Sequence, residues 1–231
     1  KVDQVVGLNN STVIYRTIFE PNAKAYGKFN GEFDVLIDKV DKAFDKLKSK
    51  GLFQNNIENT KKAFEIGIYL NALEAESNKV DGEFSELAPP TIESIKDTIN
   101  FLKEEGNNID AKILEELLNK FTKDGEITSD NVFSKLDAGQ KQAVKVLMDI
   151  NKSLLPLAKT AADRRGRSFV ELKDYNHREV LYTKQKEKDV LNTEAEAYSK
   201  GAGTFAYSLI KRTKGVKPIN FDPFETVKRG A

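Results

Sequence analysis

A short turn at residues 123–127 carries the residue types and the spacing of the middle of a calcium-binding loop. In such a loop the sixth residue is glycine, and the first and twelfth residues supply carboxylate oxygens. Placing Gly125 sixth puts Lys120 first and Asn131 twelfth. The lysine would repel the cation, and an asparagine cannot replace a bidentate glutamate. We therefore expect an ordinary turn between two helices, with no bound calcium.

The single histidine of the chain is the next candidate for chemistry. His177 alternates with Tyr175 and Glu179, so the three side chains share one face if the segment is a strand. An imidazole with such neighbours could transfer protons, but a histidine hydrogen-bonded in a turn is the more common arrangement. One histidine and no cysteine exclude thiolate sites and sites that need two imidazoles. We expect no catalytic residue, no metal and no cofactor.

Neighbouring glutamates are the remaining candidates for acid–base chemistry. Such pairs stand at positions 74 and 76, at 104 and 105, and at 115 and 116, within stretches that have helical periodicity and many lysines. We expect them on the outward, solvated faces of helices. The segment 200–204, Lys-Gly-Ala-Gly-Thr, lacks the residue order of a phosphate-binding loop, and we expect a hinge between two helical pieces there.

The charged residues are unevenly distributed along the chain. Residues 1–151 contain 20 basic and 26 acidic residues, whereas residues 152–231 contain 17 basic and 10 acidic ones. Such an excess favours contact with nucleic acid or with an acidic protein surface, although a solvated basic face or attraction between the two halves would also explain it. The candidate partner or nucleic-acid contacts are Arg164, Arg165, Arg167, Lys211, Arg212 and Lys214, with Phe221 and Phe224 as aromatic anchors.

Apolar residues recur at steps of three and four over most of the first 163 residues. This is the periodicity of amphipathic helices, and it predicts helices over about 33–50, 56–76, 91–104, 109–121 and 138–162, with a short helix that begins near Ser129. Pro156 should kink or split the last of the long helices. The residues expected to point inward are Phe33, Leu36, Ile37, Val40, Phe44, Leu47, Ile57, Phe64, Ile68, Leu73, Ile92, Ile95, Ile99, Leu102, Ile113, Leu114, Leu117 and Phe121. We predict an all-α fold in which residues 1–163 form an acidic, antiparallel multi-helix bundle.

The pattern changes after residue 163, so residues 164–231 are predicted to form a separate basic arm and tail. A short extended or hairpin segment is expected near 168–183, followed by a polar helix over about 186–199. The C-terminal tail is expected to be irregular, because Pro218 and Pro223 interrupt it. Ile219, Phe221 and Phe224 would lie extended against the chain's own bundle or against a neighbour.

The junction formed by residues 165–169 and 174–180 resembles a junction found in very large bacteriophage proteins. Its residues are Arg-Gly-Arg-Ser-Phe, followed by Asp-Tyr-Asn-His-Arg-Glu-Val. The family is that of virion-internal, multidomain polypeptides of the polyvalent or ejection type, in which a long helix ends in a basic turn and leads into an Asn-Tyr-x-Pro-like extended piece. Here Asp174 precedes the tyrosine, and His177 stands where the family has proline. The resemblance covers about a tenth of the chain and implies a mostly helical module without transferable catalytic residues.

These observations lead to one expected function and one alternative. We expect a non-enzymatic structural and interaction segment of a larger assembly, in the first place a phage virion-internal or cargo protein. Its partners would be other proteins of that assembly, in the virion interior or the bacterial cytoplasm. The alternative is a helical nucleic-acid-associated domain that uses the basic C-terminal third. The chain begins at Lys1 with no signal peptide and no apolar run long enough for a membrane span, and we expect it to be an excerpt of a longer polypeptide.

Overall fold

The computed structural model describes residues 56–80, 91–164, 171–181 and 218–230, together with single positions and short runs between 20 and 47. The chain divides into two units, Lys1–Lys46 and Leu47–Ala231. In the first unit the described positions are helical, as predicted for 33–46, but most of the predicted apolar stripe lies outside the described residues: Phe33, Leu36, Ile37, Val40 and Phe44. The boundary predicted at residue 164 does not coincide with this division.

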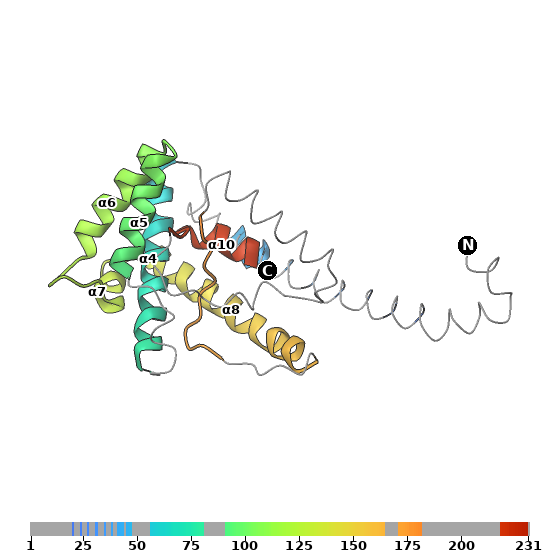
Figure 1. Cartoon of the computed structure of the whole chain (residues 1–231). Coiled ribbons are helices and arrows are strands. Elements are labelled where there is room, and N and C mark those ends of the chain that lie inside the picture. The colour runs from blue at the N-terminus through green and yellow to red at the C-terminus, as the bar shows by residue number, and fades with distance from the viewer. Residues whose placement is uncertain are drawn as a thin grey trace, which may run out of the picture. The chain divides into compact units, whose positions relative to one another are not determined.

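Helices make up most of the described part of the second unit (Figure 1). They are α4 (Ile57–Val80), α5 (Thr91–Glu104), α6 (Asn108–Phe121), α7 (Ser129–Ser134), α8 (Ala138–Arg164) and α10 (Pro223–Gly230). The only β-pairing among the described residues consists of two isolated bridges, so the predicted helical class is confirmed. No helix among the described residues has both the length and the apolar character that a membrane crossing requires.

Residues Ile57–Val80 form the central helix α4. It contacts α5, α6, α7, α8 and α10, and Figure 1 shows these helices around it. Its first turn is capped by Asn56, whose Oδ1 accepts a 2.8 Å hydrogen bond from the backbone N–H of Asn59. Phe64 and Ile68 are buried as predicted, but Ile57 is 62% exposed. Ile57 is the first residue of the helix, beyond the region that the other helices cover.

The segment that connects α5 to α6 is the part of the fold that the sequence predicted best. Gly106 adopts φ +79°, which glycine tolerates without steric cost, and Asn107 caps α6 by accepting a hydrogen bond from the backbone N–H of Asp110. The two helices pack against each other. The residues predicted to point inward and found buried in these helices are Ile95, Ile99, Ile113, Leu114, Leu117 and Phe121.

The loop after α6 is the interhelical turn that the sequence predicts. Lys123 and Glu126 exchange two backbone hydrogen bonds of 2.9 Å, and Asp124 and Gly125 between them have φ of 53° and 81°. Positive φ at both central residues defines a tight I′ hairpin turn. Further on, Pro156 lies inside α8, which continues to Arg164; the helix is therefore not split.

Two segments that are far apart in the sequence pair beside α4. Val180 forms an antiparallel bridge with Ile219, flanked by hydrogen bonds from Leu181 N to Pro218 O (2.9 Å) and from Asn220 N to Glu179 O (2.8 Å). Val180 thus pairs with the C-terminal end of the chain rather than within a local hairpin over 168–183, of which only 171–181 is described. The tail, predicted to be irregular, contains helix α10.

Helix α6 offers a matched test of the core. Leu117→Ala should lower the free energy of unfolding by about 2–5 kcal/mol, because Leu117 is fully buried and its truncation leaves a cavity. Ile109→Ala in the same helix should change it by less than about 0.5 kcal/mol, because Ile109 is 60% exposed. Urea denaturation followed by circular dichroism measures both. Equal losses would show that the packing around α6 differs from the structure.

Candidate functional site on helix α4

Residues spaced three or four apart along α4 create one face on which two distant segments dock. We call this face the docking face: it consists of Gly67, Asn71, Glu74 and Ser77 of α4, with Thr98 of the adjacent helix α5. Steps of three and four residues place side chains on one side of a helix. We call residues 171–181 the arm and residues 218–230 the tail. Both segments contact the docking face through polar groups and close packing.

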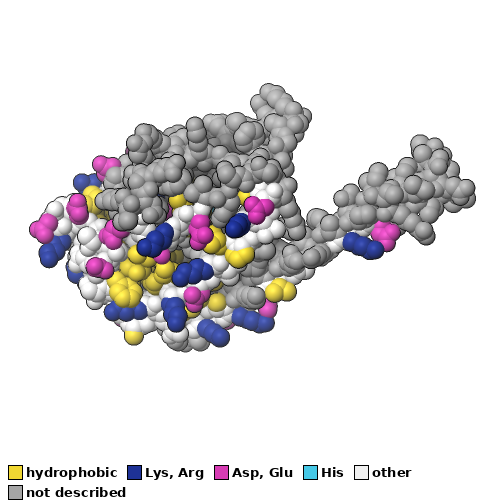
Figure 2. Space-filling view, turned by 90° about the horizontal axis from the view of Figure 1, so that it is seen from below, with side chains coloured by type: hydrophobic (Ala, Val, Ile, Leu, Met, Phe, Trp, Pro, Cys, Tyr) yellow, Lys and Arg dark blue, Asp and Glu magenta, His cyan; other side chains and the backbone are white. Residues whose placement is uncertain are grey.

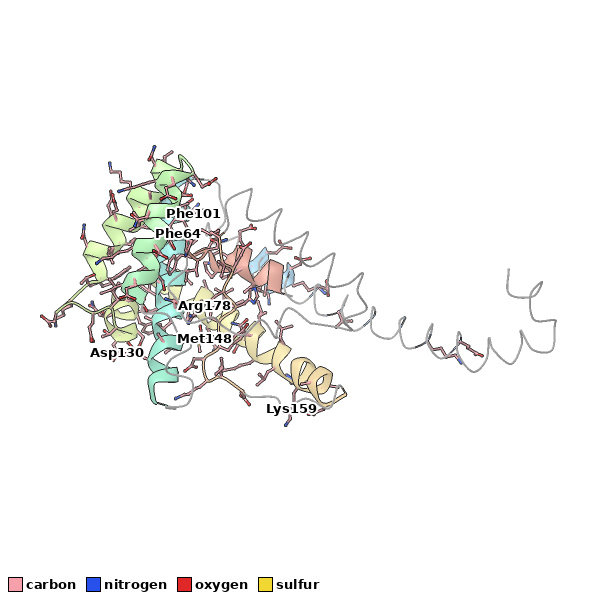
Figure 3. All side chains as sticks on the ribbon, in the orientation of Figure 1. Phe64, Phe101, Asp130, Met148, Lys159 and Arg178 are labelled. Carbon is pink, nitrogen blue, oxygen red and sulfur yellow. The ribbon has the colours of Figure 1, made fainter. Side chains whose placement is uncertain are left out.

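The arm is attached to the docking face by a buried ion pair. Arg178 Nη2 lies 2.6 Å from Glu74 Oε2, and the two side chains are 10% and 0% exposed; Arg178 is labelled in Figure 3. The prediction that Glu74 is solvated on an outward face is therefore wrong. A carboxylate buried without a partner would lose several kcal/mol of hydration, so Glu74 constrains where the arginine must lie.

The rest of the arm is held by neutral and charged hydrogen bonds. Ser77 Oγ donates to Asp174 Oδ2 at 2.7 Å, and Asp174 has φ 52°, a left-handed conformation that aspartate tolerates better than most residues. On the other side, Asn151 Nδ2 of α8 donates to the carbonyl of Tyr175 at 3.1 Å. The arm is therefore fastened to α4 and α8 at successive residues.

The tail approaches α4 so closely that only glycine fits beneath it. A Cβ added to Gly67 would lie 1.9 Å from the carbonyl oxygen of Phe221, which is less than any allowed contact. On α5, Thr98 Oγ1 accepts a hydrogen bond from Ile219 N at 3.0 Å and lies 3.1 Å from Ile219 O. The hydroxyl of Thr98 thus contacts the backbone N–H and C=O of Ile219, the groups that a neighbouring β-strand would otherwise pair with.

Buried apolar side chains recur along the tail from Ile219 to Val227. Ile219, Phe221, Phe224 and Val227 are each 3–4% exposed, and burial of a side chain of this size stabilises by about 1.5–3 kcal/mol. Of the two surfaces predicted for these residues, the chain's own body or a neighbour, the structure shows the first: the rings of Phe221 and Phe224 are buried within the chain, and Pro223 starts α10 instead of stiffening an extended strand. The role of Phe221 and Phe224 as partner contacts stays a prediction.

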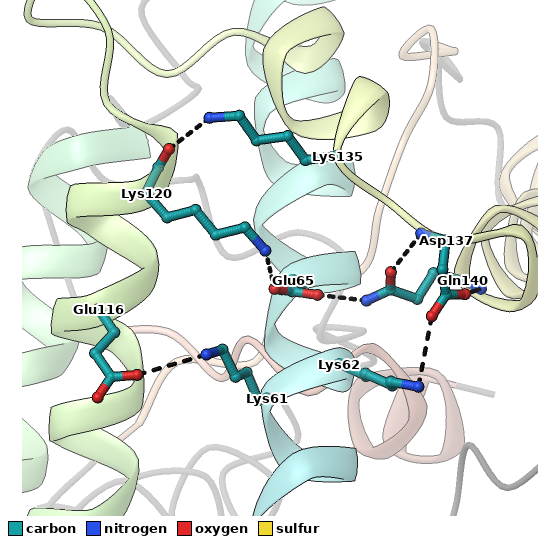
Figure 4. A network of polar contacts seen from close by, with 8 residues as sticks. All are labelled: Lys61, Lys62, Glu65, Glu116, Lys120, Lys135, Asp137 and Gln140. Carbon is teal, nitrogen blue, oxygen red and sulfur yellow. Dashed lines mark hydrogen bonds and ion pairs between the residues drawn. The ribbon is translucent and has the colours of Figure 1, made fainter.

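Two other carboxylates of α4 also join distant segments. Glu65 of α4 accepts 2.5 Å hydrogen bonds from Lys120 Nζ of α6 and from Gln140 Nε2 of α8 (Figure 4). Glu76 accepts from the backbone N–H and the hydroxyl of Ser129, at 2.7 and 2.6 Å. Because Ser129 begins α7, this carboxylate also sits at the positive end of that helix. These groups use their acceptor oxygens in structural contacts.

Helix α8 begins with a reciprocal cap that gives the structure a pH-dependent contact. Asp137 Oδ1 accepts a hydrogen bond from Gln140 N at 2.8 Å, and Gln140 Oε1 accepts from Asp137 N at 2.7 Å. The hydrogen bond from the Gln140 backbone holds the pKa of Asp137 below its ordinary value of 3.8; partial burial opposes this effect, and Lys62, at 3.4 Å, adds to it.

The basic residues predicted to contact a partner lie mostly outside the described residues. Arg164 is the last residue of α8, but its side chain is not described. Arg165, Arg167, Lys211, Arg212 and Lys214 lie outside the described residues. Their roles remain predictions. Over the described part of the face drawn in Figure 2, basic and acidic side chains alternate without forming an area of one sign.

The predicted alternation of Tyr175, His177 and Glu179 falls on the arm. Tyr175 is 41% exposed, and Glu179 Oε2 accepts a 3.0 Å hydrogen bond from Asn220 Nδ2, so that carboxylate helps to hold the tail. Among the residues that the structure describes, no group of three or more histidines, aspartates and glutamates could hold a metal ion. Comparison with protein-family models, with curated proteins and with solved structures finds no match.

Sequence reasoning missed the residues that form the docking face. A glycine inside the apolar run of α4 signals close approach of another backbone, and Gly67 could have been singled out on that ground. Thr98 and Asn71 are polar residues at positions where helical periodicity predicts core. The Asn71 Nδ2 donor lies 3.4 Å from Thr91 Oγ1, whereas Asn71 Oδ1 and Asn176 Oδ1 are buried without a hydrogen-bond partner in the described part of the chain.

Removing one partner of the buried ion pair should destabilise the protein strongly. Arg178→Ala should lower the free energy of unfolding by about 3–5 kcal/mol, because it leaves Glu74 charged and buried. The matched control is Lys103→Ala, whose pair with Glu115 has side chains 50% and 42% exposed and should cost less than about 1 kcal/mol. Chemical denaturation measures both. A loss below about 1 kcal/mol for Arg178→Ala would contradict the buried pair.

Asp137 should make stability pH-dependent in a defined direction. A carboxylate whose pKa is lower in the folded state stabilises above its unfolded pKa, and this contribution is lost as pH falls through the folded pKa. The variant Asp137→Asn keeps a good capping residue but should be less stable than the wild type at pH 7. The difference in urea midpoint between the two should shrink as the pH drops below 3.8, the ordinary pKa of an aspartate. In a Lys62→Gln background the difference should be smaller. A difference independent of pH would contradict this account.

Proposed function

We propose that this chain is a non-enzymatic structural and interaction module of a larger assembly. The observation that carries the proposal is the use of its buried or half-buried carboxylates. Glu65, Glu74 and Glu76 each connect α4 to a segment distant in the sequence. Polar groups that could otherwise serve acid–base chemistry are committed to holding the helices, the arm and the tail in one body. In this proposal the helices form an antiparallel bundle.

The two ends of a basic segment in the C-terminal third support an interaction role for it. Leu181 and Pro218, which flank residues 182–217, are joined by a backbone hydrogen bond of 2.9 Å, so this segment starts and ends at neighbouring positions of the body. By sequence, this segment contains eight basic and four acidic residues. We propose that it carries the partner contacts, with Lys211, Arg212 and Lys214 among them and Arg164, Arg165 and Arg167 preceding the arm.

The kind of assembly rests on the resemblance to phage virion-internal proteins. In that family a long helix ends in a basic turn and leads into an extended piece. Here α8 ends at Arg164, and the described arm that follows is not helical. This supports a cargo or packaging role in a virion, with the assembly located in the virion interior or the bacterial cytoplasm.

A second candidate function is nucleic-acid binding through the basic third. The observation that favours it is the segment 200–217, which has five basic residues and no acidic one. Guanidinium and ammonium groups neutralise phosphates and release counterions, so such binding weakens steeply with salt. Protein contacts made by the same residues would show a weaker dependence on salt, because apolar anchors usually dominate them.

The two functions are separated by crosslinking and by salt titration. In the source assembly, a lysine-reactive crosslinker should join Lys211 or Lys214 to other proteins more often than it joins Lys112, an exposed lysine of α6. Fluorescence anisotropy with labelled duplex DNA should show only weak, non-specific binding, with a Kd of about 10⁻⁶ M or weaker at physiological salt. The outcome that would overturn the proposal in favour of nucleic-acid binding has two parts. The wild type would bind the DNA tightly, and the slope of log affinity against log salt concentration would flatten by about two to three units in the triple variant Lys211→Ala, Arg212→Ala, Lys214→Ala.

A further inference from the structure

The tail is a compact unit that determines much of its own shape. Asn220 Oδ1 accepts a hydrogen bond from Asp222 N, and Asp222 Oδ1 accepts one from Phe224 N, both at 2.9 Å. Asp222 thus caps α10, and Pro223 supplies a favourable first helical residue. Residues 218–230 can therefore form the same local structure wherever a matching seat exists.

Among the described residues, the contacts that seat this unit come from positions more than thirty residues earlier in the chain. Gly67 leaves room for the backbone of Phe221, Thr98 bonds to Ile219, and the arm supplies the bridge partner Val180. None of these contacts depends on which copy of the chain provides the tail. An identical tail from a second copy would make the same hydrogen bonds and bury the same side chains.

The connection between seat and tail is long enough to reach a neighbour. Residues 182–217 number 36, which sets an upper limit of about 120 Å on their span. A folded body of about 150 residues, roughly the size of the unit without this connection, has an expected radius of gyration of about 15 Å. The tail of one copy can thus reach the docking face of an adjacent copy.

We propose that the docking face accepts the tail of a second copy of this chain, so that neighbouring chains exchange residues 218–230. Exchange in two directions gives a symmetric pair in which each seat is filled. The inference deepens the proposed function, and it rests on that function for the dense assembly in which copies meet. A chain tethered to its own seat has an effective concentration of roughly 1 mM or more, so exchange becomes substantial only when copies are similarly concentrated.

Engineered cysteines can test the exchange because the chain contains none of its own. Val180 and Ile219 are bridge partners whose flanking residues make the ladder hydrogen bonds. Such a pair has Cα atoms about 4.5 Å apart, within the disulfide range of about 4.4–6.8 Å. The double variant Val180→Cys, Ile219→Cys should close an internal disulfide, which shows that the tail still docks.

The test mixes a full-length Val180→Cys chain with a full-length Ile219→Cys chain under mild oxidation. Disulfide-linked dimers should increase about tenfold or more between about 10 µM and about 1 mM protein. Two controls replace the chain that provides the seat, which is the Val180→Cys chain. The first control carries Lys112→Cys, on the exposed surface of α6, in place of Val180→Cys. The second carries Val180→Cys together with Gly67→Leu, whose side chain would fill the space of the Phe221 carbonyl. Neither should link above background.

Two results would overturn the proposal. One is an internal disulfide in the double variant without linked dimers above the Lys112→Cys control at about 1 mM. The other, which does not depend on disulfide geometry, is the absence of a concentration-dependent dimer of the unmodified chain in sedimentation equilibrium over the same range. Either result would leave the crosslinking test of the proposed function unaffected, because that test concerns other proteins and the residues 211 and 214.

Discussion

The burial of α4 around its circumference is the constraint on which the described body depends. Five helices contact it, so a helix that carries Glu65, Asn71 and Glu74 has few positions at which a polar group can reach water. Because an ionised carboxylate cannot remain unpaired in such surroundings, each glutamate requires a donor from another element. Arg178 meets Glu74, and Lys120 with Gln140 meets Glu65. The polar residues of the central helix thereby decide which segments pack beside it and in what register.

The same constraint explains why the C-terminal end belongs to the body. Gly67 of α4 has no Cβ and so leaves the space that the Phe221 carbonyl occupies, and the buried hydroxyl of Thr98 on α5, which donates to Ser94 O, can still accept a hydrogen bond. The tail supplies a group for each, with the Phe221 carbonyl over the glycine and the Ile219 backbone at the hydroxyl. Its apolar side chains then complete the core. Polar specificity and apolar burial thus act on the same few residues, the first selecting the register and the second providing most of the stabilisation.

Local sequence signals were sufficient to predict the structure wherever a segment is organised by residues close to it in the sequence. The turn around Gly106, the inward residues of α6 and the turn around Gly125 follow from glycine conformation and from helical periodicity. Glu74 and Phe221 could not be assigned in this way, because their surroundings come from residues 104 and 154 positions away. A glutamate in a lysine-containing stretch is solvated in most proteins, and only the arrival of Arg178 reverses that expectation. Likewise, the sequence pattern of aromatic residues in a proline-containing tail fits anchors for a partner and buried core residues equally well.

Attachment of the tail in its own chain need not conflict with a role in assembly. A segment that fits one seat with several hydrogen bonds and four buried apolar side chains has the chemistry of a specific interface; what decides between its own seat and a neighbour's is concentration. At low concentration the tether favours closure within one chain, which covers Phe221 and Phe224 and protects the monomer from association through exposed apolar surface. At the concentrations expected inside the proposed assembly, the two modes become comparable in free energy. Under the proposed exchange, the same contacts would serve as intramolecular core before assembly and as a link between copies after it.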